Sequence, residues 1–142
     1  MNHASYDDDY IRGILTSVKT IALVGASPKP ERPSYGVMRF LLGRGYDVVP
    51  VNPGLAGQQI HGKTVVATLA DLPHPVDMVD VFRNSSEVPK LVDEVLALAT
   101  LPKVIWMQLG VSDTAAAALA QAKSIKVVMN RCPAIEIPRL HI

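Results

Sequence analysis

The sequence predicts an α/β fold: a doubly wound, mostly parallel five-stranded sheet with helices on both faces. Short, continuous apolar runs alternate with segments of helical period along most of the chain. A run without apolar–polar alternation is typical of a strand that is covered on both faces. The length of 142 residues corresponds to one domain, residues 1–142. Because crossovers in such sheets are right-handed, few topologies remain, and we expect the strand order 3-2-1-4-5.

A leading helix is expected within residues 1–19, packed on the rest of the domain. Ser5 can cap it, and the aspartates at 7–9 fall in its first turn, where the helix dipole favours negative charge. We therefore interpret this acidic run as a helix start. Four apolar residues then follow the i, i+3, i+4, i+7 spacing of one buried stripe: Ile11, Ile14, Leu15 and Val18.

The first strand and its crossover helix follow. The run TIALVG at residues 20–25 predicts a strand. Ser34 is a plausible cap for the next helix, which should end near Gly43 or Gly45. The buried side of that helix is marked by Val37, Phe40 and Leu41.

Two further strands are expected before the middle of the chain. DVVPVNP, at residues 47–53, contains Pro50, which indicates a strand end or an irregularity. The segment 54–73 has little helical period and holds at most a helical turn near 69–72. VDMVDVF, at residues 76–82, predicts the third strand.

The second half repeats the alternation. Ser86 can cap a helix that tolerates Pro89 in its first turn. KVIWMQLG at 103–110 and KVVMN at 126–130 predict the fourth and fifth strands, joined by an Ala-rich helix that begins at Ser112 or Asp113 and ends near residue 122. RCPAIEIPRLHI is expected to be a Pro-punctuated tail. The face of the helix after Ser86 is marked by Val88, Leu91, Val92, Val95 and Ala99.

Composition excludes several classes of function. A net charge of +1 does not suggest a nucleic-acid or membrane surface. The only cysteine is Cys132, so an intrachain disulfide or a Cys-rich zinc site is not possible. The acidic, polar start is unlike a signal peptide, and no apolar run approaches the ~18 residues of a membrane span. We therefore expect a cytoplasmic protein.

No catalytic or metal set is evident. The four histidines lie in separate loop or tail contexts, so neither a metal site nor a Ser–His–Asp arrangement is predicted. GQQIHGKT at residues 57–64 formally matches a P-loop, but no apolar strand precedes it and no long helix follows it. The histidines are His3, His61, His74 and His141.

The loop after the first strand is the main candidate for ligand binding. Ligands of open α/β sheets lie beyond the carboxyl ends of the strands. Gly25 allows a sharp turn, Ser27 offers a hydroxyl, and the following helix points its free N–H groups at the same space. Lys29 and Arg32 favour phosphate there, and Gly36 can permit close packing or ligand approach. Alternatively, the prolines of this loop only stiffen a solvated surface segment.

The other strand ends refine this prediction. NAD sites usually place an acid at the end of the second strand, whereas Asn52 is neutral there. Phe82 and Arg83 can flank a purine or pair with phosphate, or can be a core ring and an exposed cation. Asp77 and Asp80 are three positions apart and face opposite sides, so a paired-carboxylate mechanism has no support.

Cys132 follows the fifth strand, beside Arg131. A neighbouring cation can lower the pKa of a thiol, and this position can place the thiol near the ligand. The sequence leaves packing as the other interpretation.

Four motifs together resemble the small, stand-alone bacterial and archaeal CoA-binding proteins. These are similar to the Rossmann-like N-terminal domain of the succinyl-CoA synthetase alpha subunit. The resemblance covers residues 10–140, nearly the whole chain. The motifs are IALVGASPKPERPSYGVMRFLLGRGYDVVPVNP, DMVDVFRNSSEVP, VIWMQLGV and MNRCPAIEIPRL.

The resemblance implies a CoA site made from the strand-end loops. The 25–29 turn would hold phosphates, Asn52 and Pro53 would border the nucleotide, residues 82–84 and 88 would line the adenine side, and 108–110 would approach the pantetheine arm. The predicted cofactor-binding residues are Gly25, Ala26, Ser27, Pro28, Lys29, Arg32, Tyr35, Gly36, Asn52, Pro53, Phe82, Arg83, Asn84, Val88, Gln108 and Gly110.

We expect a protein that binds coenzyme A or an acyl-CoA without catalytic machinery of its own, and a regulatory role is compatible with this expectation. The synthetase uses a phosphohistidine in a later domain and a partner subunit, and the sequence contains neither, so synthetase activity is not expected. A protein partner or a homo-oligomer is compatible with this role. The alternative is an NAD(P)-binding redox sensor or an oxidoreductase-like enzyme.

Overall fold

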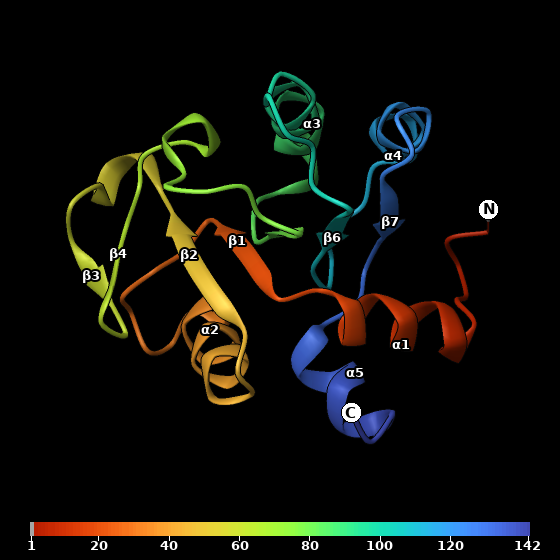
Figure 1. The fold of residues 1–142 in the computed structure, drawn as a ribbon, viewed down its shortest axis with the longest axis horizontal. Helices are drawn as coiled ribbons and strands as arrows, with labels where there is room; N and C mark the ends of the chain where they lie inside the picture. The colour runs from red at the N-terminus through yellow and green to blue at the C-terminus, as the bar shows by residue number, and fades with distance from the viewer. Residues whose placement is uncertain (1) are drawn as a thin grey trace.

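The computed structural model describes residues 2–142 and contains a five-stranded parallel sheet (Figure 1). Helices cover both of its faces, which confirms the predicted fold class. The sheet comprises β1 (Thr20–Val24), β2 (Asp47–Val51), β5 (Met78–Val81), β6 (Val104–Met107) and β7 (Lys126–Val128).

The helices divide between the two faces. One face carries α1 (Asp8–Ser17), α2 (Pro33–Gly43) and α5 (Pro133–Arg139), and the other carries α3 (Val88–Leu96) and α4 (Thr114–Gln121) (Figure 1). Each layer encloses its own cluster of buried apolar side chains. Trp106 is buried in the first cluster and Ile105 in the second, because successive residues of a strand point to opposite faces.

The expected strand order was wrong in one respect. The sheet order is β2-β1-β5-β6-β7, so the third predicted strand lies between the first and the fourth rather than outside the second. β5 is buried at all four positions, as a central strand requires, whereas β2 begins at the exposed Asp47. Pro50 lies within β2, and this edge position tolerates it because a missing N–H there breaks no ladder bond.

The segment after β2 covers the open edge of the sheet without a long helix. It forms a hairpin of β3 (Gln59–Ile60) and β4 (Lys63–Thr64), and Val66 bridges to Val51. Three short 3-10 helices complete the chain: η1 (Pro53–Leu55), η2 (Leu69–Asp71) and η3 (Ser85–Glu87). The helical turn expected near residues 69–72 is therefore confirmed as η2.

The helix starts differ from the predicted caps. Asp7, Arg32 and Glu87 occupy the cap positions of α1, α2 and α3 in place of the three predicted serines. α1 begins three residues after Ser5 and α3 begins two residues after Ser86, whereas α2 begins one residue before Ser34. Ser34 is instead buried in the first turn of α2, and Asp113 caps α4 as expected by accepting a hydrogen bond from the Ala116 N–H.

Two further boundaries were corrected. The tail after β7 forms the seven-residue helix α5, with Pro133 in its first turn and Pro138 inside it. Ala99 lies beyond the end of α3 and is exposed, so it does not belong to the buried face of that helix. In α1 the predicted stripe is buried as expected: Ile11, Ile14, Leu15 and Val18.

Within residues 2–142, no helix is long and apolar enough to cross a membrane. The same residues contain no group of three or more His, Cys, Asp or Glu side chains that could hold a metal ion.

Candidate functional site

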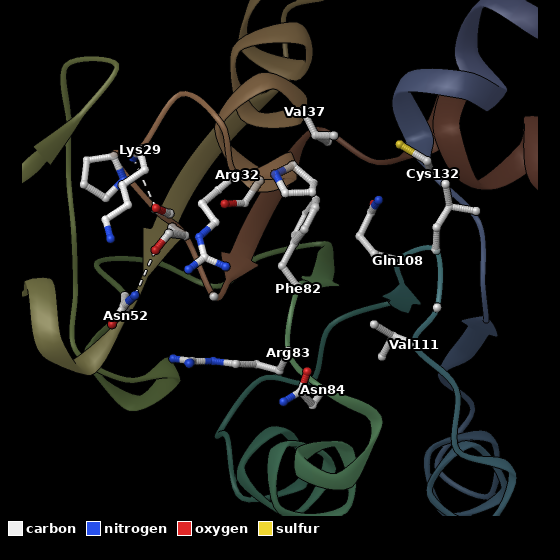
Figure 2. A pocket seen from close by; sticks show the side chains of 18 of the residues that line it. Lys29, Arg32, Val37, Asn52, Phe82, Arg83, Asn84, Gln108, Val111 and Cys132 are labelled. Carbon is white, nitrogen blue, oxygen red and sulfur yellow. Dashed lines mark hydrogen bonds between the residues drawn. The ribbon is translucent and has the colours of Figure 1, made fainter.

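A pocket of about 830 Å³ opens at the carboxyl ends of the strands (Figure 2). It lies where the chain leaves β1 toward α2 on one face and leaves the adjacent β5 toward α3 on the other, so it marks the switch in direction of the sheet. Its walls come from five segments: residues 25–37, 52–55, 82–85, 108–111 and Cys132.

Gly25 makes the first turn of the pocket possible. Its φ is +90°, and a Cβ at this position would come within 2.6 Å of the Phe82 carbonyl oxygen. The N–H of Gly25 donates to Val51, and the N–H of Phe82 donates to Val24. These bonds hold the ends of β1, β2 and β5 together. Because the Phe82 carbonyl is held this close and the φ of residue 25 is positive, only glycine fits at this position.

Asn52 ties the loop after β2 to the loop after β1. Its Nδ2 donates to the Ala26 carbonyl at 2.8 Å, and its Oδ1 accepts from the Gly54 N–H at 3.0 Å. Both ends of the amide are therefore engaged within the protein. Asn52 lines the pocket as predicted, and it shapes the wall by bracing two loops.

Replacing Asn52 by aspartate should destabilise the protein by about 1–3 kcal/mol, because the buried Ala26 carbonyl loses its donor and faces a carboxylate. The Gly54 hydrogen bond can persist in this variant. Urea unfolding measures the change, with the exposed Asn84→Asp as the matched control. Equal stability of the two variants would show that the brace is dispensable.

A second set of bonds ties the rim on the opposite side. The Ser85 hydroxyl donates to the Gly110 carbonyl and accepts from the Ser112 N–H. The Gly110 N–H donates to Asn130 at 2.7 Å. The loops after β5, β6 and β7 are thus joined along this rim.

One end of the pocket is cationic. Lys29, Arg32 and Arg83 line it, and their nitrogen atoms lie around the same end in Figure 2. Within residues 2–142, none of the three takes part in an ion pair. No acidic side chain and no histidine is among the described residues of the lining. This end is therefore suited to an anion.

The loop backbone supports the same arrangement. Ser27 accepts a hydrogen bond from the Lys29 N–H at 3.2 Å, which folds the turn over the strand end. The first turn of α2 supplies Pro33 and Ser34 to the wall, so the positive end of this helix faces the pocket.

The other end of the pocket is less polar and contains a buried amide. Gln108 is only 5% exposed, and its Oε1 has no hydrogen-bond partner among residues 2–142. Val37, Val111 and Cys132 line the same end (Figure 2). A buried amide oxygen without a partner is costly, so a ligand that donates a hydrogen bond here would be favoured.

Arg131 does not serve the pocket. Its guanidinium donates to the backbone carbonyls of Ala4, Met129 and Asn130, and it lies over the Tyr6 ring at 5.1 Å from the ring centre. It therefore anchors the segment before α1.

Most of the predicted site residues come together at this pocket. Four of them do not line it. Tyr35 contacts the His61 ring at 4.2 Å between ring centres, and Val88, the first residue of α3, is fully buried. Gly36 is exposed on α2 with no protein atom near the position of an added Cβ, so it does not serve close packing of this helix. Pro53 lines a smaller neighbouring pocket, which Arg83 also borders.

Several lining residues were not predicted. Pro33, Ser34 and Val37 share one face of the first turns of α2, so helical periodicity applied to the pocket side could have indicated them. The others adjoin predicted residues in the same loops, where no periodicity reveals side-chain direction. The unpredicted residues are Pro33, Ser34, Val37, Gly54, Leu55, Ser85 and Val111. Leu109 and Cys132, which the strand ends had indicated, also line the pocket.

The two aspartates of the third predicted strand are in very different surroundings. Asp77, at the amino edge of the sheet, accepts hydrogen bonds from the Lys19 and Thr20 N–H groups and pairs with Lys103 at 3.7 Å. Asp80 lies in the centre of β5 and is fully buried, and in the described part of the chain neither carboxyl oxygen has a hydrogen-bond partner. Desolvation raises the pKa of Asp80 well above its ordinary value.

A family model described as a CoA binding domain matches residues 19–138. The chain belongs to the CoA-binding domain family. The resemblance carried by the four sequence motifs is therefore confirmed.

The chain matches some relatives over most of their length and another over only a small part. YneT of Bacillus subtilis is 34% identical over 122 residues, which are 86% of this chain and 87% of YneT. A solved structure from Thermus thermophilus, cell-free ID.343, is 40% identical with a TM-score of 0.88, over 95% of this chain and 99% of that one. The alpha subunit of ADP-forming acetate–CoA ligase I of Pyrococcus furiosus is 31% identical over 84 residues, which are 56% of this chain and 18% of that subunit.

Proposed function

We propose that the protein binds coenzyme A or an acyl-CoA in the pocket at the carboxyl ends of the strands. The observation that carries this proposal is the meeting of three unpaired cations at one end of a pocket in a CoA-binding family domain. The phosphates of CoA occupy the end formed by Lys29, Arg32 and Arg83. The pantetheine arm extends toward Gln108.

The proposal fits the chemistry of both ends of the ligand. CoA carries its phosphates on the nucleotide, whereas the pantetheine arm is uncharged and contains two secondary amides. From one end to the other, the pocket likewise changes from cationic to mostly apolar, and its less polar end contains one buried amide, that of Gln108. Asn52 at the end of β2 is held by protein groups, so the acid that usually binds the ribose of NAD is absent at this position.

Titration calorimetry with CoA, acetyl-CoA, NAD and NADP tests the ligand. We expect binding of CoA or acetyl-CoA, and at 100 times its dissociation constant the ligand should add about 2.7 kcal/mol to the free energy of unfolding. Failure of CoA to bind at millimolar concentration would reject the proposal. Selective binding of a nicotinamide cofactor would support a redox protein in its place.

Lys29→Glu and Arg83→Ala should each weaken CoA binding by about 10- to 100-fold, since each removes a charge-assisted hydrogen bond to phosphate. Lys123→Glu is the matched control, because Lys123 is an exposed cation in the turn after α4 and does not line the pocket. Unchanged affinity in both pocket variants would exclude this placement of the phosphates. Equal loss in the Lys123 variant would indicate a general charge effect.

We also propose that binding occurs without turnover of the acyl group and that the bound state regulates a partner. Within the described lining there is no carboxylate or histidine to act as a general acid or base, which supports binding over hydrolysis. Acetyl-CoA should be recovered intact after incubation with the protein. Pull-downs with and without CoA should differ in the captured partner, and identical captures would exclude ligand-gated association.

A further inference from the structure

The only cysteine of the chain lies at the end of the pocket opposite the cations. In Figure 2 the Cys132 sulfur is at the far side of the pocket from Lys29 and Arg83, with Gln108 drawn between them. We propose that Cys132 is a thiol-exchange site that receives CoA from a CoA disulfide. The inference rests on the proposed CoA binding and adds a covalent, reversible state to the same pocket.

The order of groups along the pocket matches the order of groups along the ligand. CoA has phosphates at one end, two secondary amides in its arm and a thiol at the other end. The pocket has three cations at one end, the unpartnered amide of Gln108 farther along, and the Cys132 thiol at the opposite end. Phosphates on the cations therefore direct the sulfur end of the ligand toward Cys132.

Gln108 provides a second observation for a ligand at this end. Only 5% of this residue is exposed, and its Oε1 accepts no hydrogen bond from the described residues of the protein. An amide N–H of the pantetheine arm can donate to this oxygen. The hydrogen bond would satisfy the buried acceptor and hold the arm beside Cys132.

The surroundings of Cys132 predict selectivity rather than general reactivity. The residue is 7% exposed and forms part of the pocket wall, so reagents reach the sulfur through the pocket. The guanidinium of Arg131 donates to backbone carbonyls and lies over the Tyr6 ring. A disulfide that the pocket binds should therefore react faster than a small disulfide that it does not bind.

The exchange balances without an added oxidant. The Cys132 thiol loses its proton, and its sulfur attacks one sulfur of the CoA disulfide. The old S–S bond breaks, a new S–S bond joins Cys132 to one CoA, and the second CoA leaves as a thiolate that takes up a proton. The CoA disulfide is the oxidised reactant, and a free thiol reverses the step.

Intact-mass measurement of the reduced protein with CoA disulfide tests the exchange. We expect one added CoA moiety, removed by dithiothreitol, because the chain has one cysteine. The rate should exceed that with the same concentration of glutathione disulfide by about tenfold or more, because binding places the reacting sulfurs together. CoA without its sulfur atom, desulfo-CoA, should slow the labelling by occupying the pocket. Absence of labelling, equal rates for the two disulfides, or no protection would overturn the inference.

Variants locate the reaction. Cys132→Ser should gain no CoA mass, and Gln108→Leu should slow labelling by about tenfold, while the exposed Gln58→Leu should react like the unmodified protein. The protection experiment uses the unmodified protein, so it decides the question even when a variant fails to fold. Calorimetry with CoA separates the two proposals: CoA binding without exchange rejects the role of Cys132 alone, whereas no binding rejects the proposed function as well.

Discussion

Alanine at position 25 is expected to destabilise the protein by about 2–4 kcal/mol and to weaken CoA binding by at least about tenfold. Gly25 has a φ of +90°, which costs any other residue free energy, and the added Cβ would overlap the Phe82 carbonyl oxygen at 2.6 Å. The contact is with backbone, so relief requires β1 and β5 to separate at their carboxyl ends. Lys29 follows the end of β1 and Arg83 follows the end of β5, and both line the cationic end of the pocket. Separation of the two strand ends would therefore move these cations apart.

Gly36→Ala is the matched control for this prediction. Gly36 lies in α2 with no atom near the position of an added Cβ, and its backbone is not in the left-handed region. Alanine there should stabilise the protein by up to about 1 kcal/mol, since glycine is the poorer helix former. Urea unfolding and CoA calorimetry of both variants provide the comparison. Similar stability of the Gly25 and Gly36 variants would contradict the close crossing of the three strand ends.

Asp80→Asn is expected to stabilise the protein increasingly as the pH rises. Burial raises the pKa of Asp80 in the folded state, so the native protein holds this proton more tightly than the unfolded chain does. The stability contributed by the protonated form is complete below the unfolded pKa, about 3.9, and is lost as the pH rises through the folded pKa. Between the unfolded and the folded pKa, the free energy of unfolding falls by about 1.4 kcal/mol per pH unit. A neutral asparagine at position 80 does not titrate, so the variant avoids this loss.

Asp77→Asn is the matched control and should have the opposite sign. Desolvation acts to raise the pKa of Asp77, but hydrogen bonds from the Lys19 and Thr20 backbone and the charge of Lys103 lower it overall. Its contribution to stability is therefore present above the unfolded pKa and is lost as the pH falls through the folded pKa. Unfolding free energies from pH 2 to pH 8 check both variants, because the contribution of Asp77 is lost only below its unfolded pKa of about 3.9. A constant difference between the Asp80 variant and the unmodified protein across this range would contradict a buried, protonated acid.

Much of the candidate site could be predicted from the sequence because it follows strand ends. A buried parallel strand is recognisable as an apolar run, and its carboxyl end lies at the ligand edge of the sheet whatever the order of the strands. Gly25, Arg83 and Gln108 were assigned in this way, and all three line the pocket. Gly36 was assigned because a glycine can permit close approach, and Val88 was assigned from the family resemblance, but neither residue lines the pocket.

The direction of side chains in loops could not be predicted. Arg131 and Cys132 are adjacent in sequence, but the cation binds the segment before α1 while the thiol faces the pocket. Asn52 also depended on a distant partner, since the carbonyl that its amide binds belongs to Ala26 in the loop after another strand. Local patterns report burial and helical period, but they do not identify the atom on the other side of a contact.

The sequence by itself determined the parallel α/β architecture, the five apolar strands and the glycine turn that opens the pocket, because burial on both faces and a left-handed turn each impose a local residue pattern. The tertiary structure decided the strand order, in which β5 enters beside β1 while β2, with its proline, remains at the edge. Strand order depends on which hydrogen-bonding edges meet, and that information is shared between segments far apart in the chain. The same assembly made Asp80 a buried acid and placed Gln108 and Cys132 at one end of the pocket.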